Sequence, residues 1–173
     1  MCAATDGSGY ISIFDSVASM GFSIETILQL GKIYSIPANH SALNLKRQSV
    51  QQQKGSVDCG LFSIAFAVEI CSGENPDDAI FAQEDMRLHI LKCFTNGKVT
   101  PFPRALKIED SVVRPKLGYL SVEVFCYCKM PAQFDTEMIQ CDTCQLWYHY
   151  SCVHLDTSNI PDNWECPRCC KKN

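Results

Sequence analysis

Apolar and polar positions follow three patterns in the first part of the chain. One pattern lies in residues 9–16 (GYISIFDS), which alternate as a half-buried β-strand does. Another lies in residues 24–28, whose apolar side chains recur at helical spacing, with Ser23 placed as the N-cap and Gly31 as a stop. Residues 61–70 are apolar on nearly every face, which predicts a helix buried on all sides.

The cysteines divide the chain into two parts. Four of the twelve lie in residues 1–122, whereas eight crowd into residues 126–170. The stretch from residue 100 to residue 121 contains three prolines and a glycine, a composition typical of a connector. The sequence therefore predicts two domains that are joined by a linker.

Composition and charge narrow the classes of function. The chain has 173 residues, is 46% hydrophobic and has the composition of a soluble globular protein. Its longest apolar stretch, residues 61–71, is too short to cross a membrane, and residues 1–20 lack the pattern of a secretory signal. Without export, paired cysteines indicate metal binding rather than disulfides. The net charge of −4 argues against direct nucleic-acid binding, which needs a basic face.

Metal-ligand residues come in closely spaced pairs near the C-terminus. The eight candidate ligands are Cys126, Cys128, Cys141, Cys144, His149, Cys152, Cys166 and Cys169. A separation of one or two residues lets a tight turn present both side chains to one ion, and zinc prefers tetrahedral sets of sulfur and imidazole ligands. Eight such ligands predict two structural zinc ions. The alternative is that these are core cysteines, which would not require paired spacing.

The order of four cysteines, one histidine and three cysteines resembles the PHD finger, as does Trp164 two residues before Cys166. The resemblance covers residues 123–170 and implies a cross-brace, with two interleaved ligand sets. Cys126, Cys128, His149 and Cys152 would hold one zinc, and Cys141, Cys144, Cys166 and Cys169 the other. Cys170 is a rival to Cys169, but the spacing of Cys169 matches the family. So small a unit has little core, so its fold should depend on zinc.

The resemblance also implies a partner and a compartment. Fingers similar to this one add a histone N-terminal tail to a strand, which here would be residues 137–141 (EMIQC). The positions that form the family's methyl-lysine cage correspond here to Phe125, Ala132, Met138 and Trp147. Ala132 departs from the aromatic or polar side chain of many such cages and leaves one side open. We therefore expect a nuclear protein that binds a histone tail, methylated or unmodified. The alternative is that Phe125 and Trp147 only pack the finger.

Charged and backbone groups would complete this peptide site. Asp142, together with Asp135 and Glu137, is placed to pair with basic side chains of a tail. By analogy with the family, the backbone carbonyls of residues 161–163 would accept the terminal amine of the peptide. A finger that binds other proteins instead of histones is a further alternative.

A second candidate site lies in residues 51–60. Cys59 comes at the start of the helix predicted over residues 61–70, and a helix N-terminus favours the thiolate. Gly55 and Gly60 allow a tight turn there, and Gln53 carries an amide that can face the same atom as the thiol. The alternative interpretation is a buried structural thiol.

These residues resemble the SUMO-protease and adenain type of cysteine peptidase, which acts on ubiquitin-like protein conjugates. Cys59 matches the nucleophile, Gln53 the oxyanion-hole glutamine and Asp15 the acid that orients the base. The resemblance implies an α+β peptidase-like fragment over residues 1–104, a linker over residues 105–122, and then the zinc-stabilised finger. No histidine precedes Asp15 as the family requires, so we expect the triad to be incomplete and cleavage to be absent.

Overall fold

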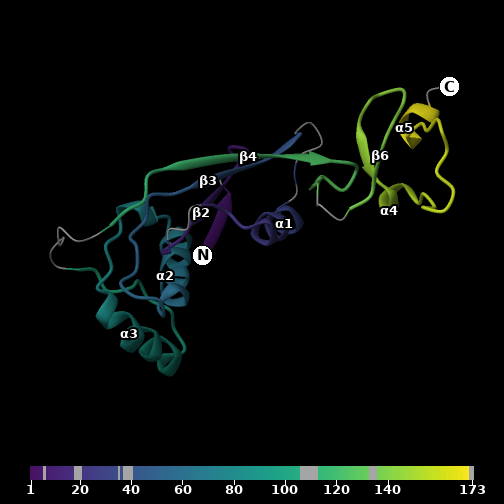
Figure 1. Ribbon diagram of the computed structural model, residues 1–173. Helices are drawn as coiled ribbons and strands as arrows, with labels where there is room; N and C mark the ends of the chain where they lie inside the picture. Colours follow the sequence, from purple (N-terminus) through teal and green to yellow (C-terminus); the bar gives the residue numbers. More distant parts are fainter. Residues whose placement is uncertain are drawn as a thin grey trace. The chain divides into compact units, whose positions relative to one another are not determined.

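The computed structural model describes residues 1–5, 7–17, 21–34, 36, 41–105, 113–132 and 136–171. The chain forms two compact units, each made of two segments (Figure 1). Unit 1 consists of Met1–Met20 with Asn44–Leu120, and unit 2 of Gly21–Leu43 with Ser121–Asn173. Within the described residues, each helix is too short or too polar to cross a membrane.

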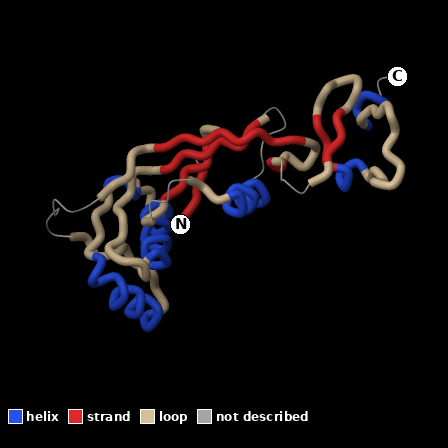
Figure 2. Tube along the Cα trace, in the orientation of Figure 1, coloured by secondary structure: helices blue, strands red, loops and turns tan. Residues whose placement is uncertain are grey.

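Unit 1 is a mixed α+β arrangement. Its elements are β1 (Cys2–Thr5), β2 (Tyr10–Phe14), most of β3 (Ala42–Arg47), α2 (Cys59–Cys71), the 3-10 helix η1 (Pro76–Asp78) and α3 (Gln83–Asn96). β1 pairs with β2 antiparallel, and β2 pairs with β3 parallel. Figure 2 shows these strands in red and the helices in blue.

Unit 2 contains shorter elements and two zinc-ligand clusters. Its elements are α1 (Ile24–Ile33), most of β4 (Gly118–Phe125), β5 (Met130–Pro131), β6 (Met138–Gln140), β7 (Trp147–His149), α4 (Tyr150–Val153) and α5 (Pro167–Cys170). β4 pairs with β5, and β6 pairs with β7, both antiparallel. The strand order within unit 1 is β1-β2-β3, and in unit 2 the strands β6 and β7 form a sheet of their own.

The strand and the first helix form where the sequence predicts them. β2 occupies Tyr10–Phe14, and its side chains at residues 11 and 13 are buried. α1 begins after Ser23, whose hydroxyl accepts the Thr26 amide hydrogen at 3.2 Å. The prediction that Gly31 stops this helix is wrong, because α1 continues to Ile33. Gly31 lies inside the helix beside Met130, where a Cβ would make an ordinary van der Waals contact with the Met130 sulfur, 3.4 Å away.

The core of unit 1 is a cluster of phenylalanine rings around α2. Phe62 and Phe66 of α2 are fully buried, with ring centroids 5.8 Å apart, and both rings contact Phe81. The prediction that α2 is buried on all sides is wrong, because Ile64 is 40% exposed and both end residues of the helix are exposed. The described elements of unit 1 cover only part of this apolar helix.

The segment expected to be a linker is partly structured. The Ser49 hydroxyl donates to the Pro115 carbonyl at 2.9 Å, and the Gln52 amide donates to the Val113 carbonyl at 3.0 Å. β4 begins at Gly118, before the expected start of the finger. Residues 106–112 of the expected linker lie outside the described residues. The domain boundaries at residues 104 and 123 stay a prediction.

Candidate metal centres and peptide-binding face

The eight predicted metal ligands gather into two clusters of four in unit 2. In each cluster the candidate ligand atoms lie within 4.8 Å of one another. One cluster consists of Cys126, Cys128, His149 and Cys152, and the other of Cys141, Cys144, Cys166 and Cys169. Because one cluster combines the first and third ligand pairs along the chain, and the other combines the second and fourth, the chain forms the interleaved arrangement of a cross-brace.

The first cluster is formed by strand ends and a short helix. Cys126 follows β4 with a φ of 63°, a left-handed conformation that turns the chain toward Cys128. His149 ends β7 and is buried, and its Nδ1 lies 3.2 Å from the Cys128 sulfur and 3.9 Å from the Cys152 sulfur. Burial lowers the pKa of His149, which keeps the imidazole in the neutral form that binds metal.

The second cluster is held by backbone amides and a tyrosine. Cys141 and Cys166 are fully buried, and the Cys166 amide donates to the Cys141 sulfur at 3.2 Å. Burial raises the pKa of the Cys166 thiol. Hydrogen bonds from Tyr148 and from the backbone of Cys169 and Arg168 lower the pKa by more than burial raises it, so that it falls below its usual value, to about 6. These donors stabilise the thiolate, which is the form that coordinates a metal.

The donor geometry fits zinc. Tetrahedral zinc with Zn–S bonds of about 2.3 Å places two sulfurs about 3.8 Å apart, and the Cys144 and Cys166 sulfurs lie 3.9 Å apart. In the other cluster, burial and then the neighbouring thiols Cys126 and Cys152 raise the pKa of Cys128 to about 11. A dication removes this repulsion between neighbouring thiolates. The sulfur of Cys170 contacts Glu165 instead of either cluster.

The finger has a very small apolar core. Tyr148 is buried between the rings of Tyr127 and Trp164, at centroid distances of 4.9 and 5.4 Å. The remaining fully buried members of this core are two zinc ligands, Cys141 and Cys166. The metal sites therefore take the place of a hydrophobic core.

Asp142 has a structural contact that sequence reasoning missed. One oxygen of its carboxylate accepts the backbone amide of Trp164 at 2.6 Å, and its own amide donates to the Trp164 carbonyl at 3.0 Å. These bonds join the loop after β6 to the loop before α5. No sequence signal indicates this pairing, because the two residues are 22 positions apart. Asp135, the neighbouring acid predicted to face a tail, lies outside the described residues.

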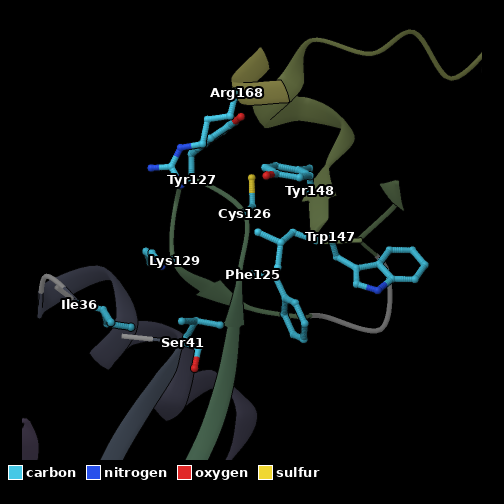
Figure 3. A pocket seen from close by; sticks show the side chains of 11 residues that line it. Ile36, Ser41, Phe125, Cys126, Tyr127, Lys129, Trp147, Tyr148 and Arg168 are labelled. Atoms are coloured by element: carbon cyan, nitrogen blue, oxygen red, sulfur yellow. The ribbon is translucent and has the colours of Figure 1, made fainter. Parts of the chain in front are cut away.

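The predicted peptide-binding residues lie around β6 and β7. Met138 pairs with His149, and Gln140 pairs with Trp147, so Met138 and Trp147 are diagonal neighbours on one face. Trp147 is 43% exposed, and Phe125 is half-buried where β4 ends. Phe125 and Trp147 both line one cavity on the finger (Figure 3). Ala132 is exposed.

The three peptidase-like residues lie in unit 1. Cys59 is exposed and is the first residue of α2. Both ends of the Gln53 amide are engaged, since Oε1 accepts the Ser16 hydroxyl at 3.0 Å and Nε2 donates to the Gly55 carbonyl at 2.8 Å. Asp15 accepts the amide of residue 17 in a local turn.

Of the two histidines outside the finger, His89 lies in the described residues, and its contacts are with groups other than the three peptidase-like side chains. His89 lies on α3, where its Nε2 is 3.0 Å from the Thr100 carbonyl and 3.5 Å from the Cys93 sulfur. His40 lies outside the described residues.

Comparison with known proteins places the finger in a family. Residues 126–169 match the PHD-finger family. The chain is 42% identical over 51 residues to lysine-specific demethylase phf2 of Danio rerio, and 42% identical over 50 residues to the chromatin remodeling protein SHL of Arabidopsis thaliana. It is 38% identical over 48 residues to human lysine-specific demethylase 7A.

These matches cover a limited part of each protein. Each covers 27–28% of this chain, and 5% of either demethylase or 22% of the remodeling protein. Residues 126–169 are thus a PHD finger. Its two Cys and His clusters hold two zinc ions.

Proposed function

We propose that the finger binds the N-terminal tail of a histone and prefers the lysine-methylated form. The observation that carries the proposal is the position of an exposed tryptophan, Trp147, beside β6. β7 pairs with one edge of β6, and no other strand in the described part of the chain pairs with β6. The similarity to two lysine-specific demethylases and a chromatin remodeling protein supports the same function.

The tail would join β6 as a third strand. Its main chain would bond to the open edge, which gives affinity, while its side chains would enter neighbouring sites, which gives specificity. The methylated ammonium would lie against Trp147, with Met138 and Phe125 as further walls. A cation over an aromatic face contributes about 0.5–2 kcal/mol. The exposed Ala132 leaves one side of this methyl-lysine site open, which gives room for a bulky methylated ammonium group.

Charge supports a basic partner. Residues 123–173 contain seven acidic and four basic residues. Glu137 is exposed immediately before β6. One oxygen of Asp142 is bound by the Trp164 amide, so its charge is held in place while the other oxygen can accept from a lysine or arginine. The carbonyls of residues 161–163 would accept the terminal amine. A histone partner would make the protein nuclear and chromatin-associated.

A second candidate function concerns unit 1. The exposed position of Cys59 at the first residue of α2 supports a peptidase-like site for ubiquitin-like conjugates. Asp15 and Gln53 would complete that site only with a histidine base, which a longer chain or a partner would have to supply. Unit 1 would then be the latter part of a catalytic domain and inactive by itself.

Backbone methylation of the peptide tests strand addition. In a strand that pairs along one edge, alternate amides face the partner, so N-methylation at every second position should abolish binding to the zinc-loaded chain. N-methylation at the intervening positions leaves those bonds and should have a much smaller effect. Calorimetry with histone N-terminal peptides of both kinds measures the difference. Equal weakening by either set of methyl groups would contradict strand addition.

A further inference from the structure

Helix α3 carries apolar side chains on two opposite faces. Met86 and Cys93 are buried, and Met86 belongs to the phenylalanine core of unit 1. On the other face, Leu88, Leu91 and Phe94 recur every three residues and are 54%, 59% and 75% exposed. A surface helix of a globular protein has one apolar stripe, which faces the core. The second stripe, here called the outer strip (Leu88, Leu91 and Phe94), is therefore not explained by the packing of unit 1.

The outer strip is accessible and has a polar rim. α3 lies on the side of unit 1 away from its strands (Figure 1). Glu84, Asp85 and Lys92 of the same helix are exposed. Arg87 forms an ion pair with Asp58 of the same unit, so its charge is already engaged. Contiguous exposed apolar side chains that are surrounded by polar residues are typical of a surface that binds another protein.

The order of charged and apolar residues along α3 is symmetric about Leu91. Leu88 and Phe94 lie three positions before and after it. Glu84 lies seven positions before it, in the first turn of the helix, and Lys98 lies seven positions after it, just beyond the C-cap. Both charged residues are exposed. The helix is therefore complementary, in charge as well as in apolar surface, to a reversed copy of itself.

We propose that two copies of this chain associate through their outer strips, with the two α3 helices antiparallel and Leu91 at the two-fold axis. Leu88 of one copy then packs against Phe94 of the other, and Glu84 lies opposite Lys98 at both ends of the contact. The macrodipoles of antiparallel helices oppose each other, which adds to the attraction. A parallel pair would instead bring Glu84 beside Glu84 and Lys98 beside Lys98, and like charges repel.

The contact is small, so the dimer is weak. α3 has 14 residues, and at 1.5 Å per residue it is about 21 Å long. One pair of helices of this length buries less than the roughly 1,600 Å² of a standard interface. We expect a dissociation constant on the order of 10–100 μM. Because each copy carries one finger, the dimer presents two.

Sedimentation equilibrium of the zinc-loaded full chain, over about 5–500 μM, tests the dimer. Leu91→Glu should weaken it at least about tenfold, because two carboxylates would then meet at the axis. Ile33→Glu makes a similar change on α1, at a side chain that is 71% exposed, and should leave the dissociation constant within about twofold. Both replaced side chains are exposed, so both variants should keep two zinc ions and the thermal midpoint of the parent. A parent that stays monomeric over this range, or equal effects of the two substitutions, would overturn the proposal.

Charge reversal tests the antiparallel pairing without touching the apolar contact. Glu84→Lys alone and Lys98→Glu alone should each weaken self-association at least about fivefold, because each variant places like charges opposite one another at both ends. An equimolar mixture of the two variants should associate at least as tightly as the parent, since every lysine then lies opposite a glutamate. A mixture that associates as weakly as either variant alone would overturn this arrangement.

Discussion

Replacing Cys169 with serine should remove one zinc ion and unfold the finger. The apolar core of the finger is formed by Tyr148 and the zinc ligands Cys141 and Cys166. Burial of one large side chain contributes about 1.5–3 kcal/mol, whereas a structural zinc site contributes about 10–16 kcal/mol. A serine hydroxyl does not replace the thiolate. The loss therefore exceeds what the remaining core supplies.

Cys170→Ser is the matched control. Cys170 is the neighbouring thiol, it is exposed, and its sulfur contacts only Glu165 in the contacts that the structure describes. Its replacement should leave two zinc ions bound and change the free energy of unfolding by no more than about 0.5 kcal/mol.

Metal analysis and amide spectra measure the outcome. Zinc released by a thiol reagent is counted with a chromophoric chelator, and the dispersion of the ¹⁵N–¹H spectrum reports whether residues 118–171 are folded. Cys169→Ser should bind at most one zinc and lose dispersion for these residues, and Cys170→Ser should match the parent. Two zinc ions in Cys169→Ser, or loss of zinc from Cys170→Ser, would refute the ligand assignment.

Individual side-chain contacts give three more expected outcomes. Arg104→Met should lower the free energy of unfolding of unit 1 by about 3 kcal/mol in a denaturant titration, because it leaves the buried carboxylate of Glu69 unpaired; a double variant with Glu69→Leu that recovers nothing would contradict this reason. Asp142→Ala should destabilise the finger by about 1–2 kcal/mol in thermal unfolding, since the Trp164 amide loses its acceptor, and an unchanged midpoint would count against that bond. The chain should not cleave a ubiquitin-like precursor, and turnover that disappears in Cys59→Ala would show that a base is present after all.

Short-range patterns predicted the pairs of zinc ligands, whereas the resemblance to the PHD finger implied which pairs share an ion. Ligands separated by one or two residues lie in one tight turn, so their spacing already determines that they face a common point. The same holds for the N-cap of α1, where Ser23 bonds to an amide three residues later. These features depend on local geometry, which a sequence pattern contains.

Contacts between distant segments could not be predicted. Gly31 was expected to stop α1, but the helix continues to Ile33, and Gly31 lies beside Met130, 99 positions later. The Asp142–Trp164 pairing and the cavity wall from Ile36 and Ser41 have the same origin. For the peptidase-like residues, the pattern located Cys59 at a helix start, yet the hydrogen bonds that occupy Gln53 arise from tertiary packing.

Calorimetry with matched histone peptides tests the central claim most directly. The zinc-loaded chain is titrated with N-terminal peptides whose lysines are either trimethylated or unmodified. At least one trimethylated peptide should bind more tightly, and Trp147→Ala should lose about 1–2 kcal/mol of that preference, or roughly five- to thirtyfold. Tyr119→Ala, which truncates another exposed aromatic residue, should keep it. If Trp147→Ala folds with two zinc ions and discriminates between the peptides as the parent does, methyl-lysine recognition at this face is contradicted.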